Sequence, residues 1–152
     1  MKEITQAYIQ LLKAIDLNNP LIFKGIREGL NKFLSNAYLS GPGHKYEKGH
    51  FYSNAAYEKV KKRDWANLIF EHMVPKHKYL QKPCVAMAKK GQLNENDVVK
   101  LVNKYWKIAI ITVEEDKLLK GKTMPKGWDG EDIFLRYTAA GIDLTAKDDL
   151  KW

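Results

Sequence analysis

The chain has few cysteines and no long apolar segment, and each scarcity excludes a class of protein. A single cysteine, Cys84, among 152 residues rules out a framework of intrachain disulfides. No run of about 18 or more apolar residues is present, so the sequence predicts no transmembrane helix. The first residues also lack the apolar core of a signal peptide. We therefore expect a cytoplasmic protein without a membrane partner.

Arginine is scarce too, although the chain is basic. Lysine and arginine number 26 against 18 acidic residues, a formal net charge of +8, but only three of the 26 are arginines. A lysine ammonium attracts phosphate as a point charge and is poorly suited to bidentate reading of bases. The excess charge fits a polyanionic partner such as nucleic acid. The alternative, a lysine-rich surface that serves only solubility, stays open.

The spacing of apolar residues predicts a mainly helical α+β fold in one domain, 1–152. Apolar residues at helical spacing over 3–15, and again after Pro20, indicate a helical hairpin within 1–40. We expect 44–143 to form a mixed α/β core and 144–152 to form a polar tail. The core should hold a small two- or three-stranded sheet covered by helices.

Two apolar segments, 68–74 and 107–112, are rich in residues that favour strands. Segment 44–52 is either a loop or a further edge strand. Ser53 is placed to cap a following helix, and Thr112-Val-Glu-Glu115 matches a capping box. Because a connection of about 30 residues suits a crossover, we expect the two apolar strands to pair in parallel.

All four histidines fall between residues 44 and 77, and one of them belongs to an unusual strand. Histidine titrates near neutral pH and suits general acid–base work. In Phe70-Glu71-His72-Met73-Val74-Pro75, alternation puts Glu71 on one face of the strand and His72 on the other, each among apolar neighbours. An ionisable group in such a place needs a partner or a function.

The segment Glu71-His72-Met73-Val74-Pro75 resembles the first half of the HNH (His-Me finger) nuclease motif. Residues 111–118, an apolar strand ending in threonine before a short acidic helix, are similar to the later part of that motif. The resemblance implies that His72 is the general base for water and that Glu71 is a ligand of Mg²⁺ or another divalent metal. Asp116 stands where the family often has a metal-binding histidine. Parallel pairing of the strands would bring Glu71 or His72 close to this acidic helix.

Several basic and aromatic residues are candidates for holding nucleic acid. A basic run contains Lys59, Lys61, Lys62 and Arg63, and Lys76 follows Pro75. Trp128 stands between two glycines and could stack on a base. Arg136 could meet a phosphate or pair with an acidic residue.

These observations lead to two hypotheses of different classes. The first is a nuclease of the toxin, restriction or mobile-element type, with catalytic residues His72, Glu71, His50 and Lys76. Without a metal, such an enzyme would work by acid–base catalysis with histidine pairs. Its partners would be DNA or RNA, with a cognate inhibitor protein or a second copy of the chain as further candidates. The second hypothesis is a non-enzymatic basic accessory protein that binds nucleic acid or protein.

Overall fold

The computed structural model describes residues 1–119 and 123–152, and it divides the chain into two compact units. The helical unit comprises Met1–Pro42 and Lys76–Tyr105, and the sheet unit comprises Gly43–Pro75 and Trp106–Trp152. Residues 76–105, which we had placed within a mixed core, therefore belong with the N-terminal helices. The chain passes between the two units three times.

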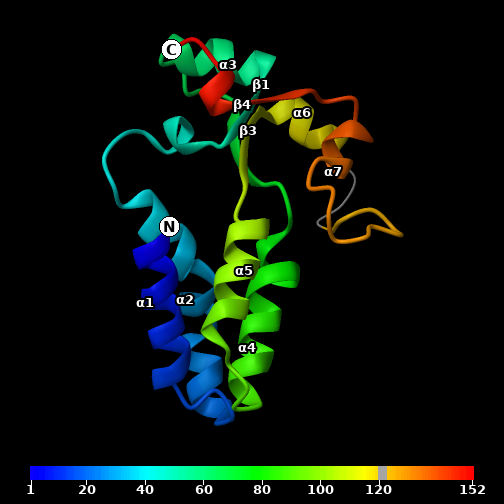
Figure 1. Cartoon of the computed structure of the whole chain (residues 1–152). Helices are drawn as coiled ribbons and strands as arrows, with labels where there is room; N and C mark the ends of the chain where they lie inside the picture. Colours follow the sequence, from blue (N-terminus) through cyan, green and yellow to red (C-terminus); the bar gives the residue numbers. More distant parts are fainter. Residues whose placement is uncertain (120–122) are drawn as a thin grey trace. The chain divides into compact units, whose positions relative to one another are not determined.

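The helical unit packs its helices side by side (Figure 1). Its helices are α1 (Lys2–Ala14), α2 (Pro20–Leu39), α4 (Lys82–Lys89) and α5 (Glu95–Tyr105). The predicted N-terminal hairpin is confirmed. The Asn19 side chain accepts hydrogen bonds from the first backbone N–H groups of α2, and Pro20, which has no N–H to satisfy, occupies the first position.

A π-helical turn, η2 (His77–Gln81), leads directly into α4. Pro83 stands in the first turn of α4 and cannot donate to the carbonyl four residues earlier. The wider turn before it accommodates this loss. The irregularity therefore lies just ahead of Pro83.

The sheet unit contains a four-stranded mixed sheet in the order β2-β3-β1-β4. The strands are β1 (Phe51–Ser53), β2 (Leu68–His72), β3 (Ile108–Thr112) and β4 (Leu144–Ala146). The α+β class is confirmed, but the sheet has one more strand than we expected. The addition is β4, which forms in the segment that we had taken for a polar tail and pairs antiparallel with β1.

The predicted pairing of β2 with β3 is confirmed, but its direction is antiparallel, not parallel. Leu68 lies opposite Thr112, and His72 lies opposite Ile108. Just beyond the strands, the Met73 N–H donates to the Lys107 carbonyl at 2.9 Å. The intervening segment thus leaves and returns at the same end of the strand pair. Because residues 76–105 fold into the helical unit, the length of this segment places no constraint on strand direction.

Short helices frame the sheet. These are η1 (Lys45–Lys48), α3 (Asn54–Lys61), α6 (Val113–Leu118), α7 (Leu135–Thr138) and η3 (Lys147–Asp149). The Ser53 cap and the Thr112–Glu115 capping box form as predicted. Tyr137 of α7 packs in a buried cluster with Ala109 and Ile111 of β3. One face of the sheet is therefore closed by α7.

No helix among residues 1–119 and 123–152 combines the length and the apolar character needed to cross a bilayer.

Candidate nucleic-acid interface

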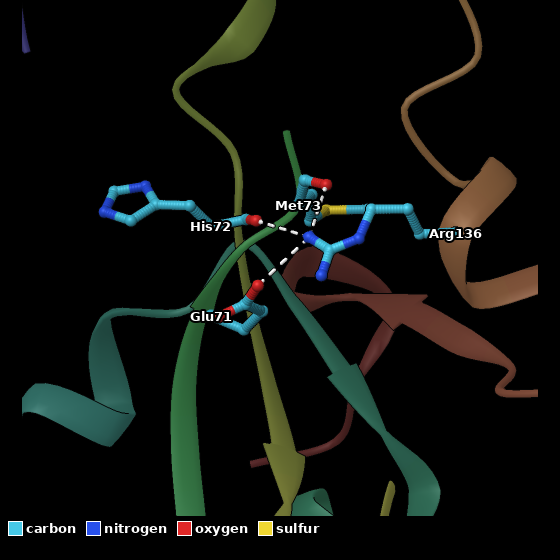
Figure 2. A network of polar contacts seen from close by, with 4 residues as sticks. All are labelled: Glu71, His72, Met73 and Arg136. Atoms are coloured by element: carbon cyan, nitrogen blue, oxygen red, sulfur yellow. Dashed lines mark hydrogen bonds and ion pairs between the residues drawn. The ribbon is translucent and has the colours of Figure 1, made fainter. Parts of the chain in front are cut away.

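Glu71 forms a partly buried ion pair with Arg136 on the α7 side of the sheet. Arg136 Nη1 donates to Glu71 Oε1 at 3.0 Å and to the carbonyls of His72 and Met73 at 3.4 and 3.5 Å (Figure 2). The side chain of Arg136 is only 5% exposed and that of Glu71 is 27% exposed. Of the two roles that we considered for Arg136, the structure supports the acidic partner and not the phosphate.

His72 lies on the opposite face of β2, as strand alternation requires. Figure 2 shows its ring pointing away from the Glu71–Arg136 pair. The ring packs edge-on against Trp106, with centroids 4.9 Å apart, and against Phe70 at 6.0 Å. Glu71 and His72 are therefore neighbours in sequence whose side chains lie on opposite faces of β2, one beside Arg136 and the other beside Trp106.

The acidic helix α6 begins at the other end of the strand pair from His72. Thr112 lies opposite Leu68, whereas Glu71 lies opposite Ala109. Glu115 is already occupied, because its carboxylate accepts from the Thr112 N–H at 2.8 Å and from Ser53 Oγ at 2.7 Å. Parallel pairing, which we expected to bring the two acidic segments together, is absent from the structure.

The donor set does not fit the metal centre that the HNH resemblance implies. Within residues 1–119 and 123–152, no group of three or more His, Cys, Asp or Glu is placed to share a metal ion. Glu71 faces a guanidinium, which competes with any cation for the same carboxylate. Burial raises the pKa of Tyr137 far above its usual range, and the charges of Glu71 and, to a smaller extent, Asp116 add to that effect. We derive no catalytic step through a metal.

His50 is bound into the backbone of the sheet. The ring Nδ1 of His50 accepts from the backbone N–H of Ile108 at 3.1 Å, and the backbone N–H of His50 donates to the Ile108 carbonyl at 2.9 Å. Burial lowers the pKa of the imidazole to about 4, and the charges of Lys107 and Lys147 add to that effect. A neutral ring that accepts a backbone hydrogen bond stabilises the junction of β1 and β3.

This lowered pKa predicts a pH-dependent contribution to stability. Below its unfolded-state pKa of about 6.5, His50 binds a proton in the unfolded chain and not in the folded one. The contribution is therefore complete above about pH 6.5 and is lost as the pH falls toward 4. We expect it to reach roughly 2 kcal/mol after allowance for the part of the ring open to solvent.

Chemical denaturation of the wild type and of His50→Asn between pH 7 and 4.5 tests this. The amide oxygen of Asn can accept from the Ile108 N–H but does not titrate in this range. The wild type should lose more stability than the variant over the interval. Parallel pH profiles for the two proteins would refute the assignment.

The remaining expected catalytic residue, Lys76, belongs to the helical unit, whereas Glu71, His72 and His50 belong to the sheet unit. Its ammonium donates to the Asn31 carbonyl at 2.8 Å and to Ser35 Oγ. Burial lowers the pKa of Lys76 to about 8. The lysine anchors the start of η2 to α2.

The residues of the basic run at the end of α3 do not all face the same surroundings. Lys59 forms an ion pair with Asp64, and Lys62 is exposed to solvent. Lys61 and Arg63 line a cavity of about 350 Å³ on the sheet unit. Lys147, Trp152, Val60 and Glu47 complete the lining, and we call this cavity the basic pocket.

An exposed tryptophan forms one wall of the basic pocket. Trp152 is 55% exposed, and its ring meets Tyr52 and Tyr57 edge-on at centroid distances of 5.1 and 5.3 Å. Its Nε1–H donates to the Lys147 carbonyl at 3.1 Å. The Lys147 ammonium lies 5.8 Å from the centre of the Trp152 ring and donates to the Glu47 carbonyl at 2.6 Å. These contacts fix an aromatic ring beside a cation.

The charge balance of the basic pocket favours an anion. Among the side chains that line it, Lys61, Arg63 and Lys147 each carry a positive charge and Glu47 carries a negative one. The Glu47 carboxylate is engaged in its own capping box, where it accepts from the His44 N–H at 2.6 Å. Three cations and an exposed aromatic face can hold a phosphate and stack on a base.

The sequence pattern identified two of the six residues that line the basic pocket. It singled out Lys61 and Arg63, but it missed Lys147 and Trp152 because it assigned them to a tail. A large aromatic residue in an otherwise polar segment was the available signal. Trp128, the aromatic residue that we had favoured, instead donates its Nε1–H to the Asp132 carbonyl in its own loop at 2.8 Å and does not line the basic pocket.

A scan of protein-family models and searches of curated proteins and of solved structures find nothing that matches this chain.

Proposed function

We propose that the protein binds nucleic acid through the basic pocket of its sheet unit. The observation that carries the proposal is the meeting of Lys61, Arg63 and Lys147 with the exposed ring of Trp152 around one cavity. Lysines supply sequence-independent attraction to phosphates, and the tryptophan supplies a stacking surface that tolerates any base. The net charge of +8 acts in the same direction over a longer range.

Fluorescence anisotropy with labelled oligonucleotides tests the proposal. We expect Lys61→Gln/Arg63→Gln to weaken binding of single-stranded DNA or RNA roughly tenfold or more at low salt, because two phosphate contacts and their counterion release are lost. The slope of log K against log salt should become shallower by about 2. Both positions are exposed, so the melting temperature should not change.

The matched control is Lys2→Gln/Lys90→Gln, which removes the same two charges from exposed positions in the helical unit. Its affinity should stay within about twofold of the wild type if the effect is local and not due to net charge. Equal losses in the two double variants would contradict a site at the basic pocket. No binding by the wild type at 50 mM salt would contradict the function itself.

Phosphodiester cleavage stays a prediction. The same mixtures, incubated with Mg²⁺ or with EDTA and resolved on a denaturing gel, also report on it. Products that disappear in His72→Ala would establish an enzyme, and their persistence in EDTA would favour an acid–base mechanism. Retention of intact strands by a binding-competent protein would leave the accessory-protein hypothesis as the better account.

A further inference from the structure

A stacked pair of aromatic rings, those of His44 and Trp65, belongs to the sheet unit together with the basic pocket. The two rings lie nearly parallel, at 13°, with their centroids 4.1 Å apart. The ring of Tyr46 flanks both of them, at centroid distances of 5.2 and 6.3 Å. His44 and Trp65 are each only half-buried. We call these two residues the aromatic pair.

Two separate segments of the chain hold the aromatic pair beside the basic pocket. On one side, the His44 N–H donates to the Glu47 carboxylate at 2.6 Å, and Glu47 lines the pocket. On the other side, Trp65 comes two residues after Arg63, which also lines the pocket. Two residues span at most about 7 Å. The aromatic pair is therefore close enough to the pocket for one nucleic-acid strand to reach both.

The turn that leads from Arg63 to Trp65 is fixed by hydrogen bonds. The Arg63 N–H donates to the Val60 carbonyl and the Asp64 N–H donates to the Lys59 carbonyl, both at 2.9 Å, which is the Schellman arrangement at the end of a helix. Arg63 has a φ of 55°, in the left-handed region where glycine is the usual residue at this position. An arginine there costs stability, and no described carboxylate pairs with its guanidinium. These features favour a binding role for the arginine side chain.

The aromatic pair offers hydrogen-bond donors as well as ring faces. The Nδ1 of His44 accepts from the Tyr46 N–H at 3.4 Å, so the proton of the neutral imidazole is on Nε2. No described residue accepts a hydrogen bond from that N–H or from the indole N–H of Trp65. The nearby carboxylate of Asp64 is already paired with Lys59. Aromatic faces and N–H donors beside a free guanidinium suit a base and its phosphate.

We propose that the aromatic pair is a second subsite for the single strand that the basic pocket holds. The base of the neighbouring nucleotide continues the stack of His44 and Trp65, and Arg63 meets the phosphate between the two subsites. This inference rests on the proposed function, because it extends the same strand beyond the basic pocket. Stacking tolerates every base, so the second subsite adds affinity without adding sequence preference.

Fluorescence anisotropy with a labelled oligothymidylate of about eight nucleotides tests the second subsite. We expect Trp65→Ala to weaken binding at least about fivefold, because one stacked base is lost. Trp65→Phe keeps an aromatic face, so its affinity should stay within about threefold of the wild type. The matched control is Trp128→Ala, which removes another half-buried tryptophan of the sheet unit and should bind as tightly as the wild type. Melting curves establish that each variant is folded at the temperature of the binding assay.

The wild-type protein provides a second readout that needs no substitution. When the same oligothymidylate is titrated in an NMR experiment, the indole N–H signal of Trp65 should move to saturation with the same dissociation constant as the signal of Trp152. A Trp65 signal that stays in place while Trp152 moves would overturn the second subsite and leave the basic pocket standing.

The variants separate the remaining outcomes. Unchanged binding in Trp65→Ala, together with weakened binding in Lys61→Gln/Arg63→Gln, would also overturn the second subsite alone. Equal losses in Trp65→Ala and Trp65→Phe would contradict stacking on Trp65. No binding by the wild type would overturn the proposed function and the second subsite together.

Discussion

Replacing Glu71 with alanine is expected to lower the free energy of unfolding by about 3 kcal/mol. The change leaves the guanidinium of Arg136, whose side chain is 5% exposed, without its carboxylate partner. A buried charge that loses its partner keeps the full desolvation penalty and loses the attraction that offset it. Urea denaturation at pH 7 measures the effect directly.

The paired variant Glu71→Leu/Arg136→Met separates the cost of an unpaired charge from the loss of packing. Both substitutes are apolar and of similar size, so most of the stability should return. A loss of less than about 0.5 kcal/mol in Glu71→Ala would contradict the ion pair. That outcome would be expected if Glu71 stood ready for a metal ion, because removing an unsatisfied carboxylate costs little.

Replacing Gly49 with alanine should destabilise the protein by about 2–3 kcal/mol. Gly49 is buried just before β1, and a Cβ there would lie 2.6 Å from Ile110 Cγ1 and 2.9 Å from Tyr52 Cζ. Neither Ile110 nor Tyr52 can move away from the added Cβ without losing packing or hydrogen bonds. Ile110 is fully buried in the central strand, and the Tyr52 hydroxyl accepts from the Gly49 N–H and donates to the Tyr46 carbonyl, both at 3.1 Å. Thermal or urea denaturation reports the change.

Gly25→Ala is the matched control, with the opposite sign. Gly25 lies inside α2, where a Cβ meets nothing within 4 Å. Alanine restricts the unfolded chain more than glycine does, so we expect a gain of about 0.5–1 kcal/mol. If Gly49→Ala raised the free energy of unfolding or left it unchanged, the result would contradict the close packing around Gly49.

Local sequence signals predicted the elements that depend on a few neighbouring residues. The Ser53 cap needs only its own hydroxyl and the Ala56 N–H, which meet at 3.2 Å. The capping box of α6 likewise closes over four residues, Thr112 to Glu115. Helical periodicity predicted the N-terminal hairpin for the same reason, because the apolar residues that form one face of each helix all lie within one short segment of the sequence.

Long-range pairings were not predictable in the same way. Strand direction depended on whether residues 76–105 belong to the sheet unit or to the helical unit, and apolar spacing within 76–105 is the same in both cases. The short strand β4 has alternation too brief to recognise, and it exists because it pairs with β1. α7 covers only Leu135–Thr138, which is too short for helical periodicity to reveal it.

The candidate site shows the same division. Lys61 and Arg63 could be found because they stand in one basic run. Lys147 joins them because its N–H donates to the His50 carbonyl at 2.8 Å at the end of the β4–β1 pairing, a contact between residues 97 positions apart in the sequence. For Arg136 the sequence offered both a phosphate and an acidic partner, and only the fold, by placing α7 over β2, decided for Glu71.

The most direct test of the central claim is an NMR titration that follows the four tryptophan indole N–H signals during addition of a single-stranded oligonucleotide. Trp152 lines the basic pocket, whereas Trp106 is 2% exposed in the core. We predict that the Trp152 signal moves together with the backbone signals of Lys61, Arg63 and Lys147, while Trp106 stays in place. Saturable shifts confined to the helical unit, or a Trp152 signal that does not move while the oligonucleotide binds, would contradict the assignment of nucleic-acid binding to the basic pocket.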